Sequence, residues 1–258
     1  MEYYGISNVV SALDKISSEY KYKNMSESKP GDFVREFFKR WPRFYYFIAL
    51  VFGPVWFVNL SARSFLAKYP KEGKTLNVGS GPKVISPDVV NVDITPYENV
   101  FVVAEAANLP FENSSIARII YDNVLEHVEQ PEKVVVEASR VMMSGGYVYI
   151  STPFLYPFHS SPSDYARWTD EGMRILLSRH GFEIVEGGVR TGPFSVLILW
   201  LCYLLASLLC FGSSRLYWFI VNISLFIFFP IKLLDVFAAH LPFSHNITSV
   251  LYFVAKKK

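Results

Sequence analysis

The stretch from Thr75 to Asp93, TLNVGSGPKVISPDVVNVD, constrains the fold of this chain more than any other segment. Two short apolar runs, one before Gly79-Ser80-Gly81 and one ending on Asp93, are typical of buried parallel strands that end at one edge of a sheet. Glycines after the first strand let the backbone approach a ligand closely, and a carboxylate after the second can accept both hydroxyls of a ribose. The segment therefore predicts a nucleoside-cofactor site, although glycine turns of this kind also occur in ordinary loops.

The bulk composition narrows the class of protein. The 258 residues fit one domain with additions, or two small domains. The net charge of +2 is close to neutral and does not indicate a basic surface for nucleic acid, so we expect no nucleic-acid partner. Cys202 and Cys210 both lie in an apolar segment, which indicates no disulfide framework. The N-terminus is polar and does not resemble a signal peptide, so we expect the chain to face the cytosol.

Strand-like and helix-like segments alternate from Thr75 to Ile184, as in an α/β domain. We expect a helix at 131–143, starting at Pro131 and stopping at Ser144-Gly145-Gly146, and another at 169–180. Strands are expected at 75–79, 89–93, 100–103, 117–121, 146–152, 182–187 and 248–255.

Composition divides the chain into four parts. Residues 1–31 are a polar leader, and residues 32–66 are aromatic with basic residues on both sides, which favours a segment at a membrane interface. The alternative for this segment is a buried aromatic helix packed on the domain. Residues 67–192 and 247–258 are expected to form the α/β domain, interrupted by an apolar insertion at 193–246.

The insertion contains two runs without a charged residue, 194–211 and 216–231. Each is at or below the length of a membrane-spanning helix. If the last strand pairs beside the strand at 182–187, both ends of the insertion lie on the same side of a membrane. The two helices then cross and return, or dip into one leaflet as a hairpin; we favour the shallow hairpin because both arms are short. The alternative is a buried or dimer-forming helix pair in a soluble protein.

Further motifs follow Asp93 in the order EAANLPF, NVLEHVEQP and SRVMMSGGYVYI. Together with LNVGSGP and NVDI, they resemble the class I S-adenosylmethionine-dependent methyltransferases, particularly the type-11 group, over roughly residues 75 to 190. The resemblance implies a Rossmann-like seven-stranded sheet with S-adenosyl-L-methionine bound across the carboxyl ends of its strands.

The same resemblance implies a set of cofactor contacts. The backbone of Gly79, Ser80 and Gly81 would face the methionine part of the cofactor, and Asp93 would hold the ribose hydroxyls. Asn77 stands where the family often has an acidic residue that contacts the cofactor's amino group.

Later motifs imply the remaining contacts. Glu105 would lie near the adenine amine with the backbone of Ala106, and Asn123 would line the floor beneath the sulfonium. For Glu105 the alternative is a solvated loop carboxylate. Glu126 and His127 are expected to be a structural pair at a helix start that bonds the neighbouring loop.

The loop between the first two strands departs from the family pattern. Pro82-Lys83 replaces the final glycine of the usual glycine-rich loop, and only seven residues separate Gly81 from the next strand. A helix of three turns does not fit in seven residues. We therefore expect a truncated first helix, with this edge of the site shaped by another segment such as 33–66.

A loop rich in proline and polar groups, TPFLYPFHSSPSDYARWT, follows the fifth strand and would project over the methyl donor. His159 is our candidate base for an acceptor hydroxyl, and Asp164 would orient or assist it. Tyr165, Arg167 and Trp168 are candidate substrate-binding residues, with Arg167 suited to an anionic group. The alternative is that Asp164, Arg167 and Trp168 only brace the loop.

This loop and the apolar region after it look like those of a bacterial methyltransferase subgroup linked with surface-glycan synthesis. We therefore expect a membrane-associated enzyme, with its domain on the cytoplasmic side of a lipid bilayer, that O-methylates a lipid-linked sugar or another amphipathic acceptor without a metal. Alternatives are a quinone or isoprenoid-lipid methyltransferase, and a non-catalytic membrane scaffold with a degenerate fold. The sequence predicts no oligomeric state.

Overall fold

A computed structural model describes residues 57–159 and 163–258. Its centre is one seven-stranded sheet in the order β3-β2-β1-β4-β5-β7-β6, in which only β7 runs antiparallel to its neighbours. The fold is therefore the Rossmann-like sheet expected from the sequence. The strands are β1 (Lys74–Val78), β2 (Val89–Asp93), β3 (Val102–Val103), β4 (Ile116–Asp122), β5 (Met142–Pro153), β6 (Phe182–Val189) and β7 (Val250–Lys257).

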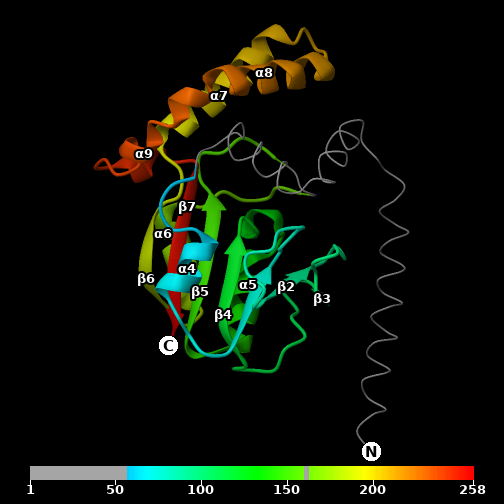
Figure 1. Ribbon diagram of the computed structural model, residues 1–258, viewed down its shortest axis with the longest axis vertical. Coiled ribbons are helices and arrows are strands. Elements are labelled where there is room, and N and C mark those ends of the chain that lie inside the picture. The colour runs from blue at the N-terminus through cyan, green and yellow to red at the C-terminus, as the bar shows by residue number, and fades with distance from the viewer. Residues whose placement is uncertain (1–56, 160–162) are drawn as a thin grey trace, which may run out of the picture.

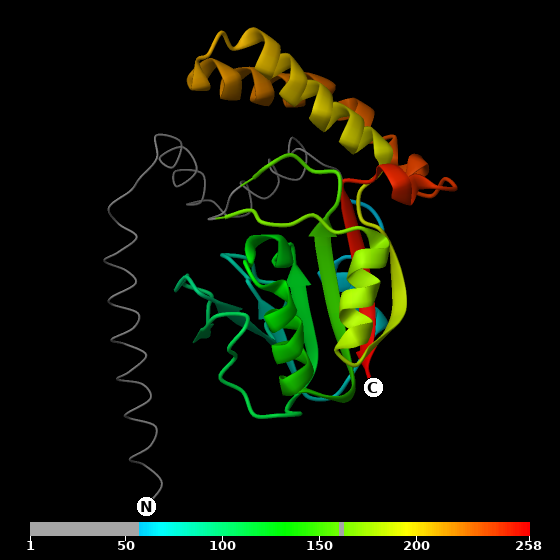
Figure 2. The same ribbon diagram turned by 180° about the vertical axis from the view of Figure 1, so that it is seen from behind.

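Side chains of the central strands alternate between the two faces of the sheet, as extended backbone requires. On one face, residues such as Tyr121 and Phe253 belong to the larger core, which α5 (Pro131–Val141) and α6 (Asp170–Arg179) cover. Figures 1 and 2 show these two helices on one side of the sheet and the short α4 (Ala62–Lys68) on the other. The central strands β1 and β4 are thus buried on both faces.

Both predicted helices of the domain are present, and one of their boundaries was wrong. In α6, the Thr169 side chain accepts a hydrogen bond from the backbone N–H of Gly172, which caps the helix start as expected. Helix α5 ends at Val141 because the chain turns extended at Met142. Ser144-Gly145-Gly146 was expected to stop this helix but instead lies inside β5, where the pairing with β4 shifts register.

The first helix of the fold is truncated, as predicted. Residues 79–88 contain no helix, and Ile85 from this loop packs in the smaller core with Phe65 of α4. Helix α4 therefore takes part of the place that a first helix would fill. The domain includes at least residues 57–66, so the expected boundary at residues 66/67 falls inside α4; the leader and residues 32–56 lie outside the described residues.

The apolar insertion connects β6 to β7, which pair as antiparallel neighbours. It consists of α7 (Pro193–Leu209), α8 (Ser214–Lys232), α9 (Asp235–Ala238) and a 3₁₀ helix (Ser244–Ile247). Because β6 runs parallel to β5, the insertion leaves the sheet at the carboxyl ends of the parallel strands, and Figure 1 shows the helices beyond that edge. Within the described ranges, α8 alone is long and apolar enough to cross a membrane by length and composition, and α7 is shorter.

The base of the insertion is held by a buried carboxylate. The two oxygens of Asp235 accept hydrogen bonds from the backbone N–H groups of Phe194 and Ser195, each at 2.8 Å, and so satisfy the first turn of α7. A Cβ on Gly192 would lie 2.2 Å from Asp235 Oδ1, so only glycine fits there. This contact attaches α9 to the start of α7.

Candidate functional site

The loop after β1 and the end of β2 are joined by a carboxylate. Asp93 accepts hydrogen bonds at 2.8 Å from the backbone N–H groups of Gly81 and Thr95. Gly79 and Gly81 both have positive φ, which glycine adopts without strain. A Cβ on Gly79 would meet Val124 Cγ2 at 2.6 Å, whereas one on Gly81 would meet nothing within 4 Å. The loop is thus packed at Gly79 and open at Gly81.

Other predicted cofactor contacts lie at the same edge in different environments. Asn77 is buried, and its amide donates a hydrogen bond to Asn91 Oδ1 at 3.0 Å, which gives it a structural tie between β1 and β2. Asn123 has φ of 58°, and its buried Oδ1 finds no hydrogen-bond partner within 57–159 and 163–258. Glu105 is exposed on its loop and Ala106 is partly buried in the larger core.

An ion pair at this edge was missed by the sequence reasoning. Lys83 Nζ lies 2.6 Å from Asp122 Oδ2, and Asp122 Oδ1 accepts a hydrogen bond from Ser151. Burial opposes ionisation of Asp122, but the Lys83 ammonium outweighs it and holds the pKa of Asp122 below its usual range. Lys83 thereby ties the short loop after β1 to the end of β4. The sequence feature that could have drawn attention to Asp122 is its position at the end of a strand, which it shares with Asp93.

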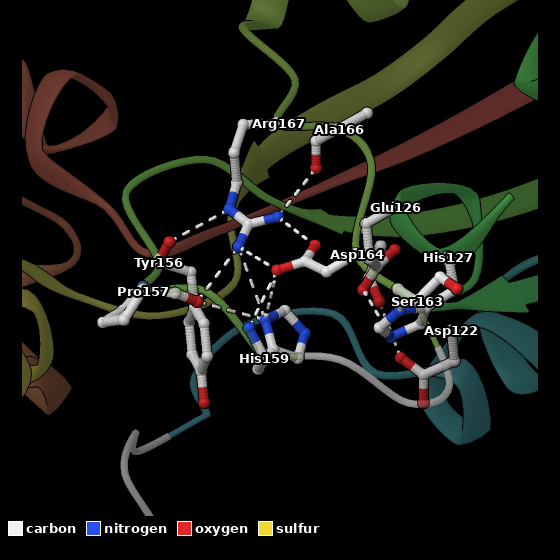
Figure 3. Close-up of polar contacts among 11 residues, drawn as sticks. Asp122, Glu126, His127, Tyr156, Pro157, His159, Ser163, Asp164, Ala166 and Arg167 are labelled. Atoms are coloured by element: carbon white, nitrogen blue, oxygen red, sulfur yellow. Dashed lines mark hydrogen bonds and ion pairs between the residues drawn. The ribbon is translucent and has the colours of Figure 1, made fainter. Parts of the chain in front are cut away.

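The loop after β5 is organised around one ion pair (Figure 3). Both terminal nitrogens of Arg167 donate hydrogen bonds to the Asp164 carboxylate, whose side chain is 1% exposed. The remaining N–H groups of Arg167 donate to the backbone carbonyls of Tyr156, Pro157 and Ala166. The five donors of the guanidinium are therefore engaged inside the loop. This arrangement favours the bracing role for Arg167 over recognition of an anionic acceptor.

His159 is held beside this ion pair. Asp164 Oδ2 accepts a hydrogen bond from the His159 backbone at 2.8 Å and lies 3.5 Å from His159 Nδ1. Burial lowers the pKa of His159, which keeps the imidazole neutral, as a base requires. Hydrogen bonding from Arg167 lowers the pKa of Asp164 to about 2, so this carboxylate stays ionised and orients its neighbours.

The two aromatic candidates of the loop differ in exposure. Tyr165 is 56% exposed, and its backbone N–H donates to the Glu126 carbonyl. Trp168 instead packs against the larger core, which matches the bracing alternative for this residue. Of the three predicted substrate-binding residues, only Tyr165 presents a largely free side chain.

Glu126 and His127 lie in a 3₁₀ helix (Leu125–His127) next to the same loop. His127 Nδ1 donates to the Ser163 carbonyl at 2.5 Å, so this histidine bonds the loop as expected. The Glu126 side chain is fully buried, and neither carboxyl oxygen has a hydrogen-bond partner in the part of the chain that the structure describes. Burial raises the pKa of Glu126 to about 8. The side chain of His127 therefore bonds the loop as expected, whereas the side chain of Glu126 does not.

Part of the described domain matches a known family of protein domains. Residues 82–150 match the family model described as "Methyltransferase domain". The strand order and the acidic end of β2 are those expected from this resemblance, and the glycine loop after β1 directly precedes the matched residues. The described domain therefore has the fold of the class I S-adenosylmethionine-dependent methyltransferases, and part of it matches the methyltransferase family model.

Solved structures of methyltransferases are similar to this chain. A protein from Galdieria sulphuraria assigned as a sarcosine dimethylglycine methyltransferase has 14% identity and a TM-score of 0.50, covering 76% of this chain and 85% of its own. A methyltransferase from Thermotoga maritima has 17% identity, a TM-score of 0.49 and coverages of 86% and 98%. Among curated proteins, none matches the chain in sequence. At these identities the structural likeness shows the fold alone.

The methyltransferase domain has the features that S-adenosylmethionine needs. Gly81 leaves open space for a close approach to the backbone, and the carboxylate of Asp93 stands at the neighbouring strand end. Asn123 adds a buried oxygen without a hydrogen-bond partner among the described residues. These residues fit the cofactor: the glycine loop would face its methionine part, and Asp93 would accept hydrogen bonds from its ribose.

Proposed function

We propose that the chain is a membrane-associated methyltransferase that uses S-adenosyl-L-methionine to O-methylate a lipid-linked sugar or another amphipathic acceptor. The observation that carries this proposal is the apolar helix pair emerging from the strand edge that holds the candidate site. When bound, the cofactor supplies a methyl group on a positively charged sulfur. The protein's own residues then position the acceptor and remove its proton.

More large apolar side chains of the helix pair are exposed than are buried between its two helices. Ile198, Leu199, Cys202, Val221 and Leu225 pack between α7 and α8. The outward surface carries large apolar side chains, and contiguous apolar surface of this kind is typical of membrane or protein contacts. The exposed residues include Leu197, Trp200, Leu204 and Leu208 on α7, and Trp218, Phe219, Phe226 and Ile227 on α8.

A lipid bilayer is the occupant that best fits this surface. Helix α8 is about 28 Å long at 1.5 Å per residue, near the thickness of the hydrocarbon core, and both ends of the insertion return to one sheet. The domain then lies on one side of the bilayer, which we propose to be the cytoplasmic side. A hairpin in one leaflet and two short crossings both satisfy this topology.

The acceptor loop is in contact with the helix pair. Tyr156 packs against the apolar cluster of α7 and α8, and its backbone carbonyl accepts a hydrogen bond from Arg167. His159 lies on the same loop, half-buried beside Asp164. An acceptor with a lipid tail and a sugar head would thus reach the membrane and the base together. We propose that His159 accepts the proton of the acceptor hydroxyl and that Asp164 orients the loop around it.

The experiment compares lipid-linked and water-soluble acceptors. Thr191 Oγ1 and Thr248 Oγ1 lie 3.3 Å apart, so residues 193–246 can be replaced by a short turn that joins β6 to β7. This deletion should lower transfer to lipid-linked acceptors in vesicles while sparing soluble sugar analogues, with S-adenosylmethionine affinity as the folding control. Equal loss on both kinds of acceptor would contradict the proposal.

One double and one single substitution, each with its own control, test the same roles in the full chain. Leu204→Glu with Phe219→Glu should weaken vesicle binding, whereas Ile175→Glu, on the exposed side of α6, should not. His159→Ala should lower turnover about 100-fold or more with cofactor affinity intact, and His245→Ala in the insertion should leave turnover unchanged. A folded protein without calorimetric binding of S-adenosylmethionine would instead favour a non-catalytic scaffold.

A further inference from the structure

Three side chains with metal-ligating atoms converge beside the acceptor loop. One ligand atom each from Glu126, His127 and His159 lies within 4.8 Å of the other two, and His127 Nε2 is 3.8 Å from Glu126 Oε1. The two imidazole rings meet edge to face with centroids 5.2 Å apart (Figure 3). We propose that Glu126, His127 and His159 bind a divalent transition-metal ion. Two imidazoles and a carboxylate suit such an ion and leave coordination positions open.

The state of Glu126 is the independent observation for this site. Its side chain is 0% exposed, and both carboxyl oxygens lack a hydrogen-bond partner in residues 57–159 and 163–258. A buried polar group without a partner is costly, so it calls for a missing water, proton or ion. A cation bound between Glu126 and the two histidines satisfies the carboxyl oxygens and supplies the opposite charge.

Both histidines are held as metal ligands usually are. A carbonyl oxygen only accepts hydrogen bonds, so His127 Nδ1, 2.5 Å from the Ser163 carbonyl, carries the proton and leaves Nε2 with its lone pair. His159 Nδ1 lies 3.2 Å from the Pro157 carbonyl and 3.5 Å from Asp164 Oδ2, which favours the same tautomer. A metal-binding histidine commonly donates its second ring N–H in this way.

The charges near the cluster also permit a cation. Arg167 lies 3.5 Å from His159 Nδ1, but its guanidinium is paired with both oxygens of Asp164. The charged side chains near Glu126 are Arg167 and the two carboxylates Asp164 and Asp122. The surroundings of the three ligands are therefore not dominated by positive charge.

A metal ion here rests on the proposed function for the identity of the acceptor, and it replaces the role of His159 as the base. In the metal-bound protein His159 is a ligand, so the ion takes over the task of a free imidazole. An acceptor hydroxyl at the open coordination position would have a lowered pKa and release its proton to water. The metal would thus activate the oxygen that is to be methylated.

Cobalt is a suitable probe because its ligand-field absorption reports the ligand set directly. The chelator-treated full chain should bind Co²⁺ at one site with saturable absorption bands and a matching calorimetric titration. Glu126→Gln and His127→Gln should each weaken Co²⁺ binding at least tenfold, with S-adenosylmethionine affinity retained as evidence of folding. His180→Ala is the matched control, since His180 also contacts a carboxylate, Glu132, but on the surface at 3.0 Å.

The outcomes separate this inference from the proposed function. Absence of saturable Co²⁺ binding by the wild-type chain would overturn the metal site, as would binding that survives in both ligand variants. Methyl transfer that persists unchanged in the chelator-treated chain would remove the ion from the reaction and leave the proposed function standing. Co²⁺ binding without transfer to any lipid-linked acceptor would support the site and count against that function.

Discussion

The carboxylate of Asp93 accepts a hydrogen bond from the backbone N–H of Gly81, 2.8 Å away, and so joins the end of β2 to the glycine loop after β1. This hydrogen bond fixes the positions of the two strand ends that would face opposite parts of one cofactor. A carboxylate has about four acceptor positions. Asp93 can therefore keep its backbone contacts and still accept two ribose hydroxyls.

Asp93→Asn should weaken S-adenosylmethionine binding by roughly 10- to 100-fold, because hydrogen bonds to a charged acceptor contribute about 1.5–3 kcal/mol. Calorimetric titration measures the change. Asp88→Asn, at an exposed position before β2, is the control and should leave affinity unchanged. Unchanged affinity in Asp93→Asn would remove this carboxylate from the cofactor site.

Gly79→Ala should mainly reduce the stability of the fold, whereas Gly81→Ala should mainly reduce cofactor affinity. Both positions have positive φ, which costs an alanine about 1–2 kcal/mol. At Gly79 the added methyl also collides with Val124, so its denaturant midpoint should fall further than that of Gly81→Ala. Gly81→Ala should mainly lower cofactor affinity, because its methyl would project into open space. A larger stability loss at Gly81 would contradict this division.

The ion pair of Asp164 with Arg167 predicts a specific pH dependence. The pKa of Asp164 is lowered from 3.8 to about 2, so its contribution to folding is complete above pH 3.8 and is lost as pH falls towards 2. Asp164→Asn should cost about 1.5–3 kcal/mol in urea unfolding, equally at pH 7 and pH 5. The difference between wild type and variant should narrow at pH 3.

A surface ion pair provides the comparison for Asp164. Asp170→Asn removes the exposed contact with Arg174 and should cost less than about 1 kcal/mol. A stability gap between wild type and Asp164→Asn that widens as pH falls from 5 to 3 would show that the Asp164 pKa is not lowered by folding.

Gly192→Ala should loosen the base of the apolar insertion. Its methyl would occupy the position of Asp235 Oδ1, which caps the start of α7. We expect faster hydrogen exchange in the first turn of α7 and in α9, with the sheet unaffected. Gly212→Ala, in the turn between α7 and α8, meets no atom within 4 Å and should leave exchange at the base unchanged. Equal exchange in both variants would argue against the Asp235 cap.

Local patterns in the sequence were sufficient for most of the fold. Apolar runs located the central strands, and the seven residues after Gly81 correctly predicted the missing first helix. The Ser144-Gly145-Gly146 error has a local physical cause: Gly146 lies in β5 where a Cβ would be 2.8 Å from the Ala117 carbonyl. A glycine required by close strand packing looks the same in sequence as one that ends a helix.

The site was less accessible from sequence because its contacts are long-range. Lys83 and Asp122 are separated by 39 positions, and nothing in either motif predicts their pairing. The Glu126 cluster also depends on the path of the β5 loop, which brings His159 to the 3₁₀ helix. The sequence suggested that Arg167 binds an anionic group of the acceptor. In the structure its N–H groups donate instead to backbone carbonyls, and the positions of these carbonyls follow only from the folded loop.

The most direct measurement is transfer of a labelled methyl group from S-adenosylmethionine to a lipid extract of the native host, followed by mass spectrometry of the product. We expect the label in a lipid-linked acceptor, on an oxygen of its head group, with transfer lost in Asp93→Asn and retained in Asp88→Asn. No transfer by a folded chain that binds S-adenosylmethionine, or label confined to water-soluble products, would contradict a membrane-associated methyltransferase.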